Sequence, residues 1–351
     1  MAKCYICEKE IADENKSKEH ILLNALGGRL KSYGLLCKNC NSDLGNDMDV
    51  ELAEQFHPFM VFLNIKRDRE KLTPYSTKRK DNDEDILIYP GGKPKLRHPI
   101  IKHGGDGKIY LVVSDDKMAN LKYKEIKKKY PNAVIESKEY KKEYITANIH
   151  LEFNDYTFLS LFKTAIGYYL YSGGERKHIQ KFISSFKKRD INGKCNYFYP
   201  EVSVVNKAEV FITHTILIIG NPQEKILYCY IELLNFFKCL FIMNDDYEGP
   251  SINKAYCYDL LGEKEIRVYT TLNLSRQELL EYIKNDPPKH IEPMIKEYKE
   301  FLSLMKYWNI TNKVCDRVSQ DLNSLHEGSS SSDLFIKYSI EEMMKMGIIK
   351  R

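Results

Sequence analysis

The sequence lacks three features that would each define a class of protein. No apolar run is long enough to span a bilayer, because the most hydrophobic stretch, residues 226–243, carries Glu232, Asn235 and Lys238. The N-terminus has no apolar segment of the kind found in secretory signals, and the chain contains no glycine-rich phosphate-binding loop. We therefore expect a cytoplasmic protein that does not contact a membrane.

The composition is that of a folded globular protein. The chain has 351 residues, of which 43% are hydrophobic and 29% charged, so it is long enough for two or three domains and is not a disordered chain. Its net charge of +5 is unevenly distributed, because residues 1–60 carry seven Lys or Arg against ten Asp or Glu. If the chain binds DNA, most of the attraction to phosphate must come from residues after 60.

The nine cysteines fall into two groups. Four of them form two Cys-x-x-Cys pairs, Cys4 with Cys7 and Cys37 with Cys40. In a cytosolic chain such pairs more often bind metal than form disulfides, and four thiolates form a closed tetrahedral site for structural Zn²⁺. The alternative is that they are buried or free thiols. The other five are isolated and typical of small buried hydrophobic side chains: Cys195, Cys229, Cys239, Cys257 and Cys315.

Three further features lie within the same segment. Glu19-His20 and Gly27-Gly28 stand between the two cysteine pairs, and Asn41 directly follows Cys40, where we expect the first turn of a helix. Together with the cysteine pairs, this pattern resembles the four-cysteine, zinc-stapled HNH endonucleases, also called His-Me finger or ββα-metal nucleases. The resemblance covers about residues 1–60.

The resemblance implies a β-hairpin followed by a helix that together hold one catalytic metal. His20 matches the general base of the family, which takes a proton from the attacking water. Glu19 and Asn41 match the ligands of a divalent cation, Mg²⁺ or Mn²⁺, whereas the four sulfurs suit zinc. These matches predict His20, Glu19 and Asn41 as the catalytic residues.

The sequence departs from the family pattern in two places. The family often has Asp where Glu19 stands, and its middle Asn has no counterpart, because Ser32-Tyr33-Gly34 occupies that place. The loop that carries His20 is therefore left without the bracing residue that the family uses. Three acidic residues on or near the expected helix are either further ligands or a solvated acidic helix start: Asp43, Asp47 and Asp49.

The pattern along the chain predicts an α+β protein with an N-terminal HNH module over 1–60. A linker that is first basic and then acidic is expected over 61–85, followed by a larger mixed α+β domain over 86–351 whose last part is helical. Ser275 with Glu278 predicts a helix N-terminus. The expected strands are 86–89, 109–113, 144–150, 210–219 and 226–242, and the expected helices are 118–130, 155–172, 175–186 and 291–307.

Two lysine-rich stretches, 66–80 and 122–142, are candidate contacts to DNA phosphate. The alternative is an exposed helix face covered with Lys/Glu pairs. The residues predicted to bind nucleic acid are Lys66, Arg67, Arg69, Lys127, Lys128 and Lys129. Lys163 and Glu232 stand within apolar stretches. Each is either a buried functional charge or, as is more common, a residue at the edge of an element with its stem buried, and we name neither as catalytic.

The sequence thus predicts a metal-dependent DNA endonuclease of restriction, antiviral defence or mobile-element biology. Two alternatives stay open: a zinc ribbon that binds nucleic acid without cutting it, and a nuclease that is activated by a ligand or partner protein acting on the C-terminal domain. A homodimer is one way to cut both DNA strands, because a chain with a single metal site needs either two such sites or two successive events.

Overall fold

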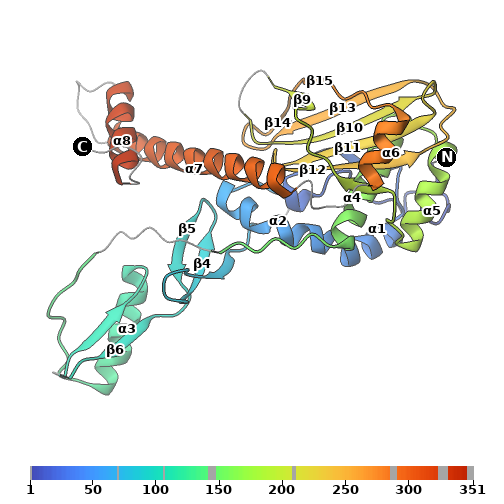
Figure 1. Ribbon diagram of the computed structural model, residues 1–351. Helices are drawn as coiled ribbons and strands as arrows, with labels where there is room; N and C mark the ends of the chain where they lie inside the picture. Colours follow the sequence, from blue (N-terminus) through green and yellow to red (C-terminus); the bar gives the residue numbers. More distant parts are fainter. Residues whose placement is uncertain are drawn as a thin grey trace. The chain divides into compact units, whose positions relative to one another are not determined.

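The computed structural model describes residues 2–68, 71–105, 107–140, 148–207, 211–284, 291–322 and 331–345 (Figure 1). The chain divides into two compact units. Unit 1 comprises Met1–Phe56, Ile65–Glu70 and Glu152–Arg351, and unit 2 comprises His57–Asn64 and Lys71–Leu151. Unit 2 is therefore inserted into the sequence of unit 1. The mixed helices and antiparallel sheets confirm the predicted α+β class.

Unit 1 begins with a short hairpin and a helix. Strand β1 (Glu19–His20) pairs antiparallel with β2 (Lys31–Ser32). Helix α1 (Lys38–Leu44) then begins directly after Cys37, so Cys40 lies in its first turn. The loop between the strands contains the short helix η1 (Asn24–Leu26). It turns so tightly that only glycine fits at position 28, where a Cβ would lie 2.0 Å from the carbonyl oxygen of Leu22. A π-helical turn, η2 (Gly45–Asp49), joins α1 to α2 (Val50–Leu63), in which the boundary between the units falls.

The centre of unit 1 is a six-stranded antiparallel sheet in the order β14-β13-β10-β11-β12-β8. Every residue of β11 is buried, and so are all but the last residues of β10 and β12, so the sheet is covered on both faces. Its strands are β8 (Cys195–Tyr197), β10 (Thr213–Asn221), β11 (Ile226–Leu233), β12 (Phe237–Asn244), β13 (Ile252–Asp259) and β14 (Lys264–Glu265).

The single strand predicted over 226–242 is wrong, because the chain reverses direction inside it. Leu234 and Asn235 have φ angles of 53° and 64°, and the antiparallel pair β11–β12 folds about them. The Asn235 side chain supports this turn, since its Oδ1 accepts hydrogen bonds from the backbone N and the hydroxyl of Thr213. A leucine in a left-handed turn position gives no local turn signal, so the apolar run conceals the hairpin.

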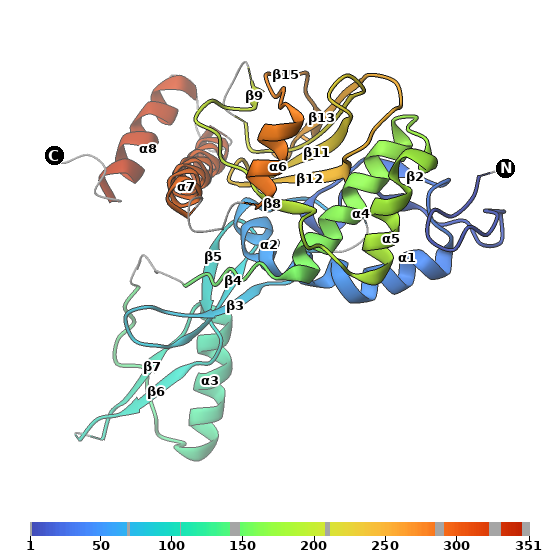
Figure 2. The ribbon, with the colours of Figure 1, turned by 45° about the vertical axis from the view of Figure 1, so that its right-hand side comes forward.

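Helices cover the two faces of this sheet (Figures 1 and 2). Phe162 of α4 (Asp155–Tyr171) stacks on Phe182 of α5 (Gln180–Lys188) and meets Phe241 of β12 edge-on, with ring centroids 5.2 Å apart. On the other face, Leu279 of α6 (Arg276–Lys284) joins the apolar cluster that contains Leu240. The predicted capping box at the start of α6 is confirmed by reciprocal hydrogen bonds between Ser275 and Glu278.

The last part of unit 1 is helical, as predicted. Helix α7 (Ile291–Leu322) is longer than the expected 291–307, and its Phe301 packs on Phe236 at the β11–β12 turn. Helix α8 (Ser331–Lys345) packs on the second half of α7 through Leu334 and Tyr338. The smaller elements of unit 1 are η3 (Arg176–Ile179) and the antiparallel pair β9 (Val205–Asn206) with β15 (Tyr269–Thr270).

Unit 2 consists of two small antiparallel sheets and a helix. A three-stranded sheet contains β3 (Tyr75–Lys78), β4 (Asp85–Tyr89) and β5 (Lys93–Leu96), and its Ile86 and Ile88 pack on Val61 at the end of α2. Residues 61–85, the predicted linker, thus include the end of α2 and strand β3. The other elements are β6 (Ile100–His103), β7 (Ile109–Val112) and α3 (Asp116–Lys129). The strand expected over 144–150 falls mostly outside the described residues, and 148–150 lie in no strand.

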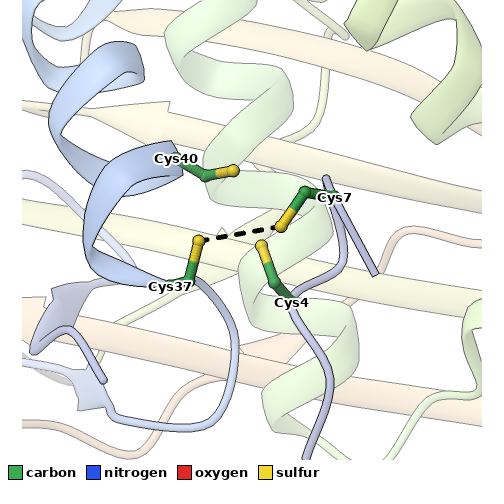
Figure 3. Close-up of side chains that lie close together, drawn as sticks. All are labelled: Cys4, Cys7, Cys37 and Cys40. Carbon is green, nitrogen blue, oxygen red and sulfur yellow. Dashed lines mark hydrogen bonds between the residues drawn. The ribbon is translucent and has the colours of Figure 1, made fainter. Parts of the chain in front are cut away.

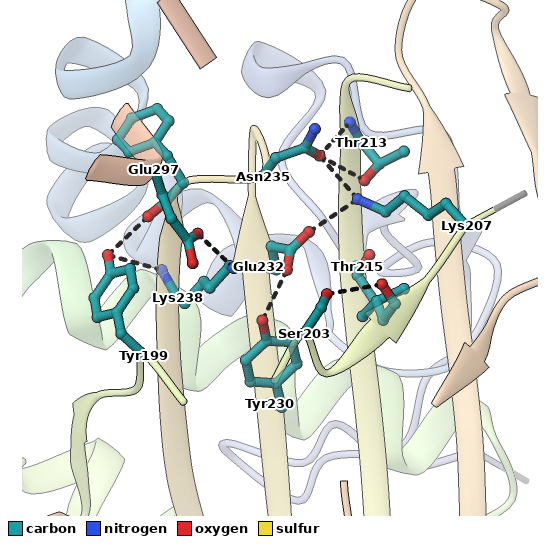
Figure 4. Close-up of polar contacts among 12 residues, drawn as sticks. Tyr199, Ser203, Lys207, Thr213, Thr215, Tyr230, Glu232, Asn235, Lys238 and Glu297 are labelled. Atoms are coloured by element: carbon teal, nitrogen blue, oxygen red, sulfur yellow. Dashed lines mark hydrogen bonds and ion pairs between the residues drawn. The ribbon is translucent and has the colours of Figure 1, made fainter. Parts of the chain in front are cut away.

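Glu232 lies at the centre of a polar network buried against the sheet of unit 1 (Figure 4). Its carboxylate is 3.0 Å from the ammonium of Lys207 and 3.7 Å from that of Lys238, and it accepts a hydrogen bond from the Tyr230 hydroxyl. Lys238 also pairs with Glu297 of α7. Burial alone would raise the pKa of Glu232, but the two lysines outweigh burial and lower it, so the carboxylate stays ionised. Glu232 lies near the end of β11, as expected of a residue at an element's edge, but its charged group is buried as well as its stem.

Replacing the central carboxylate of this network should destabilise the sheet. We expect Glu232→Gln to lower the free energy of unfolding by about 3 kcal/mol, because two lysines would lose their shared counter-ion away from water. The midpoint of denaturant unfolding measures the change. The exposed Glu201→Gln is the matched control and should leave the midpoint in place. Equal midpoints for Glu232→Gln and the wild type would contradict the structural role of this network.

Candidate active site and zinc-binding cluster

The four cysteines of the two Cys-x-x-Cys pairs converge at the N-terminus of α1 (Figure 3). All four sulfur atoms lie within 4.8 Å of one another, and those of Cys7 and Cys37 are 3.7 Å apart. Tetrahedral zinc with bonds of about 2.3 Å places its sulfur ligands about 3.8 Å apart. Both the spacing and the soft donor set therefore fit structural zinc.

The local backbone explains why these sulfurs meet. The first pair lies in a turn in which Cys4 N donates to the Lys9 carbonyl and Glu8 adopts a left-handed conformation. The second pair begins at the N-cap of α1. Burial acts to raise the pKa of Cys7, but hydrogen bonds from the Lys9 backbone and from the other three cysteines outweigh it and lower this pKa to about 7. A thiolate, the form that binds metal, is therefore accessible near neutral pH at Cys7, whereas burial raises the pKa of Cys4 and of Cys40.

Glu19 of strand β1 lies in a buried cluster of charges. Only 4% of Glu19 and 4% of Lys163 is exposed, and the Lys163 ammonium is 2.8 Å from Glu19 Oε1. The same ammonium is 2.5 Å from Asp49 Oδ2, and Asp49 Oδ1 accepts a hydrogen bond from Ser160. Burial alone would lower the pKa of Lys163, but the two carboxylates raise it, so the lysine remains a cation. Lys163 therefore binds both acids.

The two predicted ligands of the catalytic metal lie in the same region of the module. The Asn41 side chain acts to lower the pKa of Glu19, although burial outweighs it and raises this pKa, and the Asn41 Nδ2 donates to the Ser17 hydroxyl over 2.7 Å. The Tyr5 hydroxyl, which interacts with Glu19 and Asp49 electrostatically, is buried and has no hydrogen-bond partner in the described part of the chain. Mg²⁺ and Mn²⁺ prefer oxygen ligands, and this region supplies carboxylate and amide oxygens together with a buried hydroxyl that has no partner. The donor types therefore fit such an ion.

His20 faces a residue that the sequence did not single out. Its Nε2 lies 3.1 Å from the carboxylate of Asp68, and the two side chains are 19% and 16% exposed. Arg29 and Lys31, on the same hairpin, also pair with Asp68. Burial outweighs the effect of Asp68 and lowers the pKa of His20, so the imidazole is neutral at pH 7. Asp68 is one of two acidic residues within the basic stretch 66–80, and this position is the only sign of it in the sequence.

The predicted nucleic-acid-binding residues fall in both units. In unit 1, Lys66 is exposed and pairs with Glu263, and Arg67 is partly buried. Arg69 lies outside the described residues. In unit 2, Lys127, Lys128 and Lys129 form the last turn of α3, and Lys127 donates to the Pro131 carbonyl.

Of the three acidic residues near α1, only one lies in the charge cluster. Asp49 lies in the cluster with Glu19, whereas Asp47 pairs with Arg189. Lys163, which was expected at the edge of an element, lies buried in the middle of α4, and an apolar helical stripe gives no information on which charges a lysine within it meets.

Comparison with known proteins finds one match, in the N-terminal segment. Residues 4–57 match the family model described as HNH endonuclease, which confirms the predicted resemblance of this segment. The match includes the four cysteines, Glu19, His20 and Asn41, and it ends before Asp68 and Lys163. No curated protein and no solved structure matches the chain. None of the helices among the described residues is long and apolar enough to cross a membrane.

Disrupting the sulfur cluster should remove zinc and destabilise the module. We expect Cys37→Ser to lose the bound zinc and to lower the melting temperature, because the binding free energy of a structural zinc is largely folding free energy. Elemental analysis and thermal unfolding measure both effects. Cys315→Ser, at an exposed thiol of α7, is the control and should retain zinc. Wild-type protein that contains no zinc after purification without chelators would overturn the assignment.

Removing the buried lysine should leave two carboxylates without a cation. We expect Lys163→Met to lower the free energy of unfolding by about 3–5 kcal/mol, and the triple variant with Glu19→Gln and Asp49→Asn to recover most of this loss. Lys181→Met, at an exposed position of α5, should have no effect. Denaturant unfolding of the four proteins measures the differences. If Lys163→Met is as stable as the wild type, the charge cluster does not hold these elements together.

Proposed function

We propose that the protein is a metal-dependent endonuclease that hydrolyses phosphodiester bonds of DNA. The observation that carries the proposal is the match of residues 4–57 to the HNH endonucleases, a segment that includes Glu19, His20 and Asn41. A segment that only binds nucleic acid has no need for a histidine base and two hard oxygen ligands. The positive balance of the residues after 60 supports an anionic polymer as substrate.

His20 supplies the base in this reaction. Its neutral imidazole takes a proton from a water molecule, and the resulting hydroxide attacks the phosphorus atom as the bond to the leaving oxygen breaks. A divalent cation held by Glu19 and Asn41 would offset the negative charge that develops on the phosphate oxygens. The sulfur cluster takes no part in the chemistry, because four cysteine ligands leave zinc no open position, and it holds the first turn of α1 with Asn41 in place.

One observation favours a second function. The Glu19 carboxylate already has a cation, the Lys163 ammonium at 2.8 Å. If this ion pair satisfies Glu19 completely, the module holds no catalytic metal and binds nucleic acid without cutting it. The two functions differ in whether a folded, zinc-loaded protein cleaves DNA.

A plasmid nicking assay separates these functions. We expect the wild type to nick supercoiled DNA in Mg²⁺ or Mn²⁺, EDTA to stop the reaction, and His20→Ala to lower the rate by at least about 100-fold with folding and zinc unchanged. His98→Ala, at an exposed histidine of unit 2, is the matched control and should cut at the wild-type rate. Gel shift without nicking by the zinc-loaded wild type would establish the binding function instead.

A further inference from the structure

We propose that Asp68 is the positioning residue for His20, and that its carboxylate fixes the imidazole so that Nδ1 accepts the proton from water. This inference rests on the proposed nuclease function and adds a residue from outside the HNH segment to the site. Asp68 lies 48 residues after His20 in the chain and 11 residues beyond the end of the family match.

The Asp68 carboxylate receives three donors from one hairpin. His20 Nε2 lies 3.1 Å from Oδ2, Arg29 Nη1 lies 2.5 Å from Oδ1, and the Lys31 ammonium pairs with Oδ2. Lys31 foremost, together with His20 and Arg29, holds the pKa of Asp68 well below its usual range. The carboxylate is therefore ionised at any pH at which His20 could act as a base.

The ionised state of Asp68 decides which nitrogen of His20 carries the proton. A carboxylate without a proton can only accept hydrogen bonds, so Nε2 must be the N–H group that faces it. A neutral imidazole has one N–H, which leaves the lone pair on Nδ1. Asp68 thus selects the tautomer and restricts the rotation of the ring, and it stabilises the imidazolium that forms once Nδ1 takes a proton.

The backbone around Asp68 is held against the hairpin by separate contacts. Asp68 N donates to Asn24 Oδ1 over 3.1 Å, and Arg29 Nη2 donates to the Lys66 carbonyl over 3.1 Å. Lys66 is in turn 2.5 Å from Glu263, which follows β13. These contacts fix the position of the carboxylate, which a positioning residue requires.

The same geometry would also arise if Asp68 occupied the place of a substrate phosphate. Arg29 and Lys31 are the residue types that bind phosphate, and a carboxylate between them could block an incoming DNA strand. The two roles predict opposite effects on the rate. Removal of a positioning residue slows cleavage, whereas removal of a blocking anion accelerates it.

Single-turnover cleavage and DNA affinity of Asp68→Ala test the proposal in the full chain. We expect the cleavage rate at saturating DNA to fall roughly 10- to 100-fold, while the dissociation constant for DNA stays equal or decreases because Arg29 and Lys31 lose their counter-ion. Asp81→Ala, at an exposed carboxylate that pairs with Arg79 in unit 2, is the matched control and should leave the cleavage rate and the dissociation constant unchanged. A rate equal to or above that of the wild type would overturn the proposal.

Nitrogen NMR of the histidine side chains gives a second readout that needs no cleavage. We expect the His20 ring, identified by the signal lost in His20→Ala, to be the Nε2–H tautomer in the wild type and a mixture of tautomers in Asp68→Ala. An unchanged tautomer would overturn the role of Asp68 even if the enzyme is slower. If the wild type does not cut DNA, the proposed function fails, and the tautomer still decides whether Asp68 orients His20.

Discussion

The ammonium of Lys163 lies between the carboxylates of Glu19 and Asp49, and all three side chains are almost completely removed from water. Each charge would be costly alone at this depth, so the three depend on one another. They come from strand β1, from the turn after α1 and from α4. One set of ion pairs therefore holds the hairpin, the helix of the HNH module and the principal helix beneath the sheet in a single arrangement.

A buried hydrogen bond and apolar packing also hold the HNH segment against the rest of unit 1. The buried His214 of β10 hydrogen-bonds the Leu26 carbonyl, and a Cβ at Gly27 would collide with Ile65 and Leu260. The segment that matches the family therefore shares its core with later parts of the chain. This sharing gives Lys163 and Asp68 access to Glu19 and His20, so later residues hold the side chains that the family segment supplies.

The parts of the site that the sequence could predict depend on local spacing. Two Cys-x-x-Cys pairs make tight turns, and Asn41 follows the second pair directly, so their convergence needs no knowledge of the remaining chain. Lys163 and Asp68 meet their partners across 144 and 48 residues, through packing that no local pattern encodes. The β11–β12 hairpin was missed for a different reason, because Leu234 adopts a left-handed conformation that ordinarily selects glycine or asparagine. The element types were predictable, whereas the long-range charge pairs were not.

The central claim is that Glu19 and Asn41 hold a divalent cation although Lys163 is paired with the same carboxylate. Electron paramagnetic resonance of Mn²⁺ titrated into the zinc-loaded full chain tests this most directly, because free and protein-bound Mn²⁺ give distinct signals. We expect the wild type to bind Mn²⁺, and Glu19→Gln and Asn41→Ala to lose this ion while they retain zinc. If both variants still bind Mn²⁺, or if the wild type binds none, Glu19 and Asn41 do not hold the cation.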